Sequence, residues 1–175
     1  MKSFPWFKSY PKGIPHEVKL YEYESAIDLF EKSCERFLQK VAFENMGKRL
    51  TYGEVDKLSR DFAAYLQNGL GLRKGERIAI QMPNLLQFPI AFFGALRAGL
   101  IVVNTNPLYT PREMEHQFKD SGATAIVIVA NFASNLEKII SKTQIKHVIV
   151  TELGDMLGGL KGALVNFVVR KIKKM

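Results

Sequence analysis

Alternation of strand-like and helix-like segments between Arg77 and Thr151 constrains the fold of this chain more than any other feature. The expected strands are rich in β-branched residues and cover 77–81, 101–104, 124–130 and 147–151. Apolar patterns of helical period separate them, at about 85–98, 110–122 and 132–143. Strands that alternate with helices form a parallel sheet with helices on its faces. The sequence therefore predicts an α/β fold of the doubly wound kind.

Helix starts are marked by hydroxyl side chains that can accept backbone hydrogen bonds. Ser25 is an expected N-cap for a helix with a broad apolar stripe. Thr51 with Glu54, and Thr110 with Glu113, have the spacing of a capping box. Glycines at the expected helix ends, such as Gly122, supply the stop signals. These signals predict well-defined helices from local sequence alone.

The chain divides into three parts by composition. Residues 1–24 are rich in proline and aromatic residues and are expected to form an extended arm that packs on another surface. Residues 25–152 form the α/β unit, including a short hairpin around the turn 45–48. Residues 153–175 form a tail with four glycines, an apolar run and a basic end.

Composition indicates a globular protein and limits its compartment. The hydrophobic fraction is 47% and the charged fraction 24%, which excludes a disordered chain. Cys34 is the only cysteine, so we expect a small buried residue in a reducing compartment rather than a nucleophile. No apolar run is long enough for a membrane span, and prolines interrupt the N-terminus where a secretory signal would need a continuous apolar core. We therefore expect a cytoplasmic protein.

The basic tail has two interpretations. The stretch from Met156 to Met175 contains five of the chain's lysines and arginines and no acidic residue, within a net charge of +8. It is either a solvated or packed end, or a contact for anionic lipid at the inner face of the membrane. The residues for a lipid contact are Arg170, Lys171, Lys173 and Lys174. Nucleic-acid binding is not expected, because the aromatic residues and the basic cluster lie at opposite ends of the chain.

Motifs for catalysis are missing from these 175 residues. Gly154 and Gly159 have the spacing of a phosphate loop, but Lys161 comes one place too late and Gly162 offers no hydroxyl for a metal. We interpret this segment as a flexible glycine linker. The three histidines match no metal-site spacing. The sequence therefore assigns no catalytic, cofactor-binding or metal-binding residue.

Two asparagines follow expected strands. Asn84 lies in the turn after 77–81, and Asn106 in the loop after 101–104. Ligands of open α/β sheets bind beyond the carboxyl ends of the strands, so these residues could line a substrate region. Asparagine also suits turns because it tolerates left-handed backbone, and this second interpretation is the one we favour.

Several motifs in combination resemble the adenylate-forming acyl-CoA synthetase superfamily. The resemblance runs from about Ile27 to Thr151. It rests on Leu50-Thr51-Tyr52-Gly53-Glu54-Val55, Gly75-Glu76-Arg77-Ile78-Ala79-Ile80, Met82-Pro83-Asn84, Ala95-Leu96-Arg97-Ala98-Gly99 and Val103-Asn104-Thr105-Asn106-Pro107-Leu108-Tyr109-Thr110. Three features resemble the bacterial long-chain fatty acid–CoA ligase branch in particular. They are Trp6 with Tyr10-Pro11-Lys12-Gly13-Ile14-Pro15, the run Asn104-Thr105-Asn106-Pro107-Leu108-Tyr109, and Leu164-Val165-Asn166-Phe167-Val168-Val169.

The resemblance implies the first subdomain of a larger enzyme. That enzyme would use ATP, Mg²⁺ and CoA to activate a long-chain fatty acid, and the phosphate loop and catalytic lysine would follow this segment. We therefore expect residues 1–175 to be inactive alone. The resemblance also implies a homodimer through N-terminal segments, and an incomplete sheet is expected to self-associate through its open edges. The alternative is a short non-catalytic protein that binds a membrane or a partner through its arm and tail.

Overall fold

A four-stranded parallel sheet forms the centre of the molecule in the computed structural model, which describes residues 4–17 and 23–172. The strand order is β4-β3-β5-β6, and Ile78 of β3 lies between Val102 of β4 and Ala125 of β5. The strands are β3 (Arg77–Gln81), β4 (Ile101–Asn104), β5 (Ala125–Val129) and β6 (His147–Thr151). The predicted α/β fold is confirmed.

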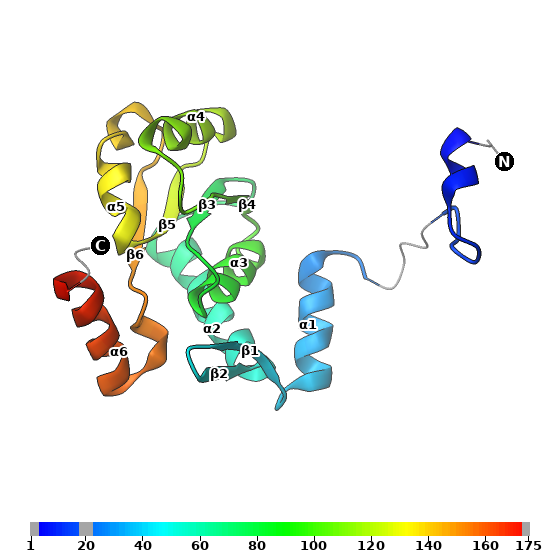
Figure 1. Ribbon diagram of the computed structural model, residues 1–175, viewed down its shortest axis with the longest axis horizontal. Helices are drawn as coiled ribbons and strands as arrows, with labels where there is room; N and C mark the ends of the chain where they lie inside the picture. Colours follow the sequence, from blue (N-terminus) through cyan, green and yellow to red (C-terminus); the bar gives the residue numbers. More distant parts are fainter. Residues whose placement is uncertain (1–3, 18–22, 173–175) are drawn as a thin grey trace.

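Helices cover both faces of the sheet (Figure 1). On one face lie α2 (Tyr52–Ala64) and α3 (Gln87–Arg97), and on the other lie α4 (Pro111–Ser121) and α5 (Ala130–Glu137). Strand β5 is buried along its whole length, and its alternate residues enter the two cores. Val127 packs with α2 and α3, whereas Ile126 packs with α4. This two-sided burial explains why β5 is a continuous apolar run.

The direction of chain travel reverses between β3 and β5. The connection through α3 places β4 on one side of β3, and the connection through α4 places β5 on the other side. Loops at the carboxyl ends of β3 and β5 therefore diverge to opposite faces. In open α/β sheets this divergence creates the crevice that ligands use.

A hairpin and a helix precede the sheet. Helix α1 (Ala26–Phe37) is followed by β1 (Val41–Asn45) and β2 (Lys48–Thr51), which pair antiparallel. Met46 and Gly47 form the turn with φ of 50° and 77°, the positive values that a two-residue hairpin turn of this type requires. The predicted hairpin is confirmed. A separate core joins it to α1, α2 and α3, through Phe30, Cys34, Leu50, Val55 and Leu86.

The predicted caps are present. The Ser25 hydroxyl accepts from the Asp28 N–H, and both capping boxes are complete. Gly122 ends α4 with φ 65°. Because each cap depends on residues only a few positions apart, local sequence was sufficient to predict it.

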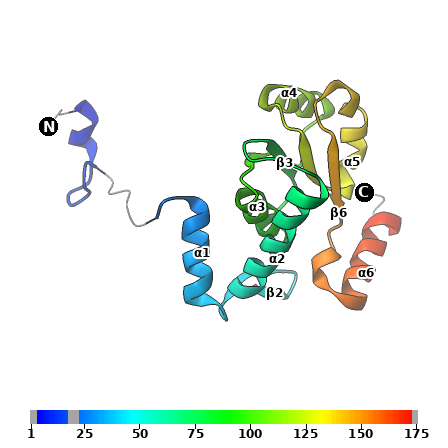
Figure 2. The ribbon, with the colours of Figure 1, turned by 180° about the vertical axis from the view of Figure 1, so that it is seen from behind.

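The N-terminal arm is not extended throughout, so that part of the prediction is wrong. Pro5–Ser9 form a 3₁₀ turn, and rings in this segment stack on one another. Phe4 stacks on Trp6 with ring centroids 4.6 Å apart, and Phe7 stacks on His16 at 4.1 Å. Trp6 is still 55% exposed. Figures 1 and 2 show this aromatic turn apart from the sheet and its helices.

The helix expected at 132–143 differs from α5 at both ends. In the structure, α5 starts at Ala130, directly after β5, and ends at Glu137. The chain then turns so that Ile139 is buried, and Ile140–Lys142 form a separate 3₁₀ turn. This turn places Ile139 in the core that contains Met114 and Phe118.

The segment 154–161 is not a flexible glycine linker, and that prediction is wrong. After the 3₁₀ turn Asp155–Leu157 the chain forms α6 (Gly159–Phe167), which continues as a π turn over Val168–Ile172. Gly154 and Gly162 lie so close that a side chain on either would collide with the other's carbonyl oxygen. Lys161 also donates to the Met46 carbonyl, which ties α6 to the hairpin turn. Glycine here permits close approach of two backbone segments rather than flexibility.

Candidate functional site

Gln81 connects the loops that follow β3 and β4. It is the last residue of β3 and is fully buried. Its Nε2 donates to the Asn106 carbonyl at 3.2 Å, while its Oε1 has no hydrogen-bond partner. A buried acceptor without a partner is costly, which makes this corner of the sheet an unusual polar position. Gln81 was not among the predicted site residues, although a polar residue directly after the apolar run 78–80 was a signal for it.

The Asn106 side chain stabilises its own loop. Its side-chain Oδ1 accepts from the Leu108 N–H at 3.0 Å, which is the local turn that asparagine commonly forms. The Asn106 backbone carbonyl accepts the hydrogen bond from Gln81, and Asn106 is exposed. This geometry favours the turn interpretation, and a ligand contact at Asn106 stays a prediction.

Asn84 lies at a different surface, beside the hairpin. Its carbonyl accepts from Asn45 Nδ2 at 3.0 Å, so the turn after β3 is joined to the end of β1. A cavity of about 190 Å³ lies here between the hairpin and the start of α3. Asn84 lines this cavity and Asn106 does not. The structure therefore does not bring the two predicted residues together in one pocket.

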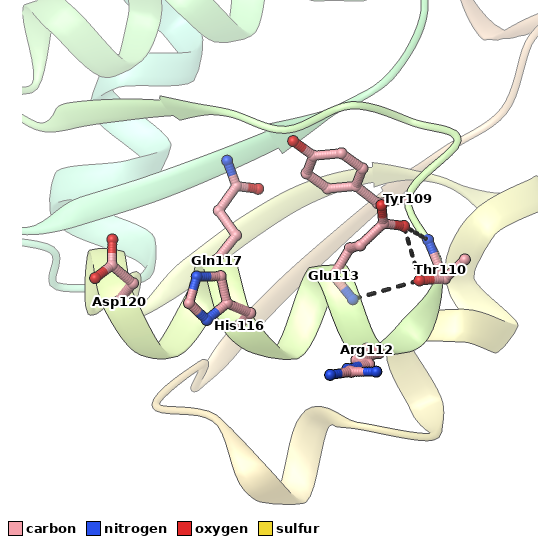
Figure 3. A pocket seen from close by; sticks show the side chains of 7 residues that line it. All are labelled: Tyr109, Thr110, Arg112, Glu113, His116, Gln117 and Asp120. Atoms are coloured by element: carbon pink, nitrogen blue, oxygen red, sulfur yellow. Dashed lines mark hydrogen bonds between the residues drawn. The ribbon is translucent and has the colours of Figure 1, made fainter.

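A larger groove of about 750 Å³ runs along one face of α4 (Figure 3). Gln117 Nε2 donates from this face to the Asn104 carbonyl of β4 at 3.1 Å, so the groove lies beside the edge of the sheet. The Gln117 Oε1 atom is buried without a partner. The lining residues are Tyr109, Thr110, Arg112, Glu113, His116, Gln117 and Asp120.

The Glu113 side chain in this groove caps the N-terminus of α4. Its carboxylate accepts from the Thr110 N–H at 2.8 Å and from the Thr110 hydroxyl at 2.7 Å, as the dashed lines in Figure 3 show. The backbone bond, followed by the hydroxyl bond, lowers the pKa of Glu113 below its ordinary value. A carboxylate held ionised by a cap is poorly suited to accept a proton in catalysis. Glu113 is therefore assigned to the helix cap rather than to acid–base chemistry in the groove.

The described part of the chain offers neither a metal-binding cluster nor a reactive cysteine. Within residues 4–17 and 23–172, no three His, Cys, Asp or Glu side chains lie close enough to hold a metal ion. Cys34 is buried, and burial, followed by the nearby Asp56 charge, raises the pKa of its thiol to about 11. A thiol that stays protonated at neutral pH is a poor nucleophile. Cys34 therefore acts as a core residue.

The tail cations are not equivalent. Arg170 forms an ion pair with Glu152, whose side chain is largely buried. Lys171 is exposed, and Lys173 and Lys174 lie outside the described residues. A cavity of about 180 Å³ beneath this helix is lined by Asn131, Glu152 and Arg170 among others. The anionic partner of Arg170 is thus already present in the protein.

The segment 154–162 does not fit nucleotide phosphates. Phosphate loops present free backbone N–H groups to their ligand. Here the Gly154 N–H donates to Asn166 Oδ1 at 2.7 Å, and Gly154 is packed against Gly162. The segment 154–162 therefore does not form a phosphate loop.

Comparison with known proteins places the chain in a family. A model described as "AMP-binding enzyme" matches residues 30–171. Long-chain-fatty-acid–CoA ligases from Yersinia pestis and Escherichia coli O157:H7 are 58% and 57% identical to it over 170 residues. These alignments cover 97% of the chain but 30% of each relative.

Solved structures agree with this assignment. A benzoate CoA ligase from Burkholderia xenovorans LB400 matches with a TM-score of 0.67 and 27% identity, over 79% of this chain and 27% of that one. The anthranilate CoA ligase AuaEII matches with a TM-score of 0.69 and 25% identity, over 74% of this chain and 25% of that one. The chain therefore belongs to the AMP-binding enzyme family, within which it matches the N-terminal part of long-chain fatty acid–CoA ligases.

Proposed function

We propose that this chain is the N-terminal part of a long-chain fatty acid–CoA ligase. The longer enzyme would form an acyl-adenylate from ATP, with Mg²⁺, and then transfer the acyl group to CoA. The observation that carries this proposal is the identity of 57–58% across 97% of the chain to ligases of that name. The short non-catalytic alternative gains no support from these comparisons.

The role proposed for residues 1–175 is structural. They supply a sheet, its covering helices and strand-end loops, and among the described residues no three His, Cys, Asp or Glu side chains could hold a metal ion. Catalysis of adenylate formation requires groups that stabilise charge on the transferring phosphate. Asn84 and Asn106 are proposed only as part of the wall of the substrate region.

The coding sequence downstream of Met175 tests this proposal. A reading frame that continues into a loop rich in glycine, serine and threonine supports the ligase. A stop codon directly after Met175 contradicts it, and the non-catalytic alternative would then be tested first by binding assays.

We also propose a cytoplasmic protein that touches anionic membrane peripherally through its tail. Within residues 4–17 and 23–172, every helix is too short or too polar to cross a bilayer. Support for surface contact comes from exposed Lys171 and from three exposed apolar side chains on α6, Leu160, Leu164 and Phe167. Because Arg170 is paired with Glu152, its share of the attraction is expected to be small.

Homodimer formation is part of the same proposal. The exposed rings of the arm, among them Trp6, and the open edges of the sheet are surfaces that a second subunit could cover. Analytical ultracentrifugation tests it, because a chain that sediments as a monomer at every concentration would contradict self-association.

A further inference from the structure

A groove of about 500 Å³ lies among helices α1, α2 and α3, separate from the cavities described above. Part of its wall is apolar, and the apolar lining side chains are Ile27, Ala63, Ala64 and Leu96. Its other lining groups include two arginines, Arg60 and Arg97, and one acid, Glu31. Apolar walls with a few convergent polar groups are typical of small-molecule sites. The groove therefore has the composition of a binding site for an amphipathic molecule.

Arg97 is the most buried of these charged groups. Its side chain is 6% exposed, and its Nε atom has no hydrogen-bond acceptor among the described residues. Its two Nη atoms donate to Asp56 and Ser59 of α2. A guanidinium carries five N–H donors in a fixed fork, so Arg97 keeps donors that these bonds do not use. A buried cation with spare donors favours an anionic group beside it.

Glu31 shows which chemical group the position beside Arg97 accepts. Its Oε1 atom lies 3.3 Å from Arg97 Nη2, and both residues line the groove. A carboxylate from α1 therefore already reaches the guanidinium. The Glu31 side chain is 41% exposed, and exposed ion pairs contribute little, so Glu31 can turn into solvent at small cost. The carboxylate of a ligand can then take its place.

The charges at the groove balance only while Glu31 is in place. Arg60 and Arg97 both pair with Asp56, so two cations share one carboxylate. Glu31 supplies the second negative charge. When the Glu31 side chain turns away, the group of Arg60, Arg97 and Asp56 keeps one positive charge. The groove is then complementary to a ligand with a single negative charge.

We propose that this groove binds a carboxylate that carries a hydrocarbon chain. The head of the ligand replaces the Glu31 carboxylate beside Arg97, with Arg60 as the second cation, and the chain lies along the apolar wall. The exchange trades one carboxylate for another, so the buried cation is never left without a partner. The inference goes beyond the proposed function, because binding at this groove requires no phosphate, metal ion or CoA.

Nuclear magnetic resonance titration of residues 1–175 with decanoate, below the concentration at which it forms micelles, tests the site. Decanoate is expected to shift the backbone amide signals of Ala63, Ala64 and Leu96 in a saturable way. Acetate is expected to bind at least about tenfold more weakly, because each buried methylene group contributes up to about fourfold in affinity. Decanol has the chain without the charge, so it is expected to bind more weakly than decanoate and to be insensitive to changes of Glu31 and Arg60.

Glu31→Gln and Arg60→Gln are expected to change the affinity for decanoate in opposite directions. Glu31→Gln removes the internal competitor and should tighten binding about two- to fivefold, the range of an exposed ion pair. Arg60→Gln removes a cation and should weaken binding by about the same factor. Glu35→Gln and Lys57→Gln, exposed changes on the same two helices outside the groove, are the matched controls and should leave the affinity unchanged.

Three results would each overturn the proposal. The first is the absence of saturable decanoate binding to the wild-type chain. The second is equal affinity for decanoate and decanol, which would show that the charge is not recognised. The third is weaker binding by Glu31→Gln, because a purely structural role of Glu31 predicts a loss where the exchange of carboxylates predicts a gain.

Discussion

Arg97 of α3 and Asp56 of α2 form an ion pair in the interior of the helical layer. Arg97 Nη2 lies 2.5 Å from Asp56 Oδ1, and the Arg97 side chain is 6% exposed. Its Nη1 donates to the Ser59 hydroxyl at 2.9 Å, and its guanidinium lies over the Phe30 ring at 5.2 Å. Burial acts to raise the pKa of Asp56, but hydrogen bonds from Arg60 and Arg97 outweigh it and hold the pKa below its ordinary value. This pair joins α1, α2 and α3 into one unit.

Replacing Asp56 by alanine should destabilise the protein strongly. The change leaves the Arg97 charge buried without its main partner, which typically costs about 3–5 kcal/mol. Urea unfolding followed by circular dichroism measures the loss. Asp61→Ala is the control, because its pair with Lys57 is exposed and such pairs contribute less than about 1 kcal/mol. Equal effects of the two variants would contradict a central role for the buried pair.

Gly94→Ala should weaken the contact between α2 and α3. A side chain at Gly94 would lie 3.0 Å from the Ser59 carbonyl oxygen and 2.8 Å from the Phe62 ring. Backbone cannot move aside cheaply, so overpacking is expected to cost about 1–3 kcal/mol in unfolding free energy. At Gly69 the added methyl meets only the half-exposed Tyr65 ring, which can rotate away. Urea unfolding of both variants measures the difference. Gly69→Ala should be nearly neutral, and a loss similar to that of Gly94→Ala would contradict the packing argument.

Gly162→Ala should detach α6 from the rest of the protein. The new methyl would lie 2.5 Å from the Gly154 carbonyl oxygen, at a place where two backbone segments touch. Once α6 no longer packs on the protein, its backbone becomes accessible to a protease. Limited proteolysis is therefore expected to remove the tail of Gly162→Ala faster than the tail of the wild type. Ala163→Ser, at the exposed neighbouring position, is the control and should leave the cleavage rate unchanged. A tail that remains equally protected in Gly162→Ala would show that the contact does not hold α6.

The capping boxes should make the stability of the folded protein depend on pH. Backbone and hydroxyl hydrogen bonds from Thr51 and Thr110 lower the pKa values of Glu54 and Glu113 in the folded state. A lowered folded pKa means that this stabilisation is present above the unfolded pKa near 4.5 and is lost as pH falls through the folded pKa. The double variant Glu54→Gln with Glu113→Gln should thus melt below the wild type at pH 7, with a gap that narrows below pH 4.5. A gap that is constant from pH 7 to pH 3 would contradict this account.

Membrane contact should depend on apolar and basic residues of the tail together. Leu164→Ser and Lys171→Gln are each expected to reduce flotation with vesicles that contain anionic lipid. The effect of Lys171→Gln should be absent with neutral vesicles, because it depends on lipid charge. Leu108→Ser is a matched control, because Leu108 is also highly exposed but lies in the loop before α4. Equal flotation of all variants would contradict a lipid role for the tail.

Features fixed by near neighbours could be predicted from the sequence. The caps at Ser25, Thr51 and Thr110, the hairpin, and the fully buried β5 all follow from patterns of a few residues. The polar corner at Gln81 could not be located in this way, because its partner Asn106 lies 25 positions away on another loop. The tail shows the same limit. Lys161 contacts Met46 across 115 positions, and the role of Gly154 depends on Gly162 returning against it.

Acyl-CoA formation is the most direct measure of the central claim, which is that this chain is the scaffold part of a ligase whose chemistry lies elsewhere. The assay supplies a long-chain fatty acid, ATP, Mg²⁺ and CoA to residues 1–175 and, in parallel, to the full product of its reading frame. The account predicts acyl-CoA from the full product and none from residues 1–175. Turnover by residues 1–175 alone would contradict it.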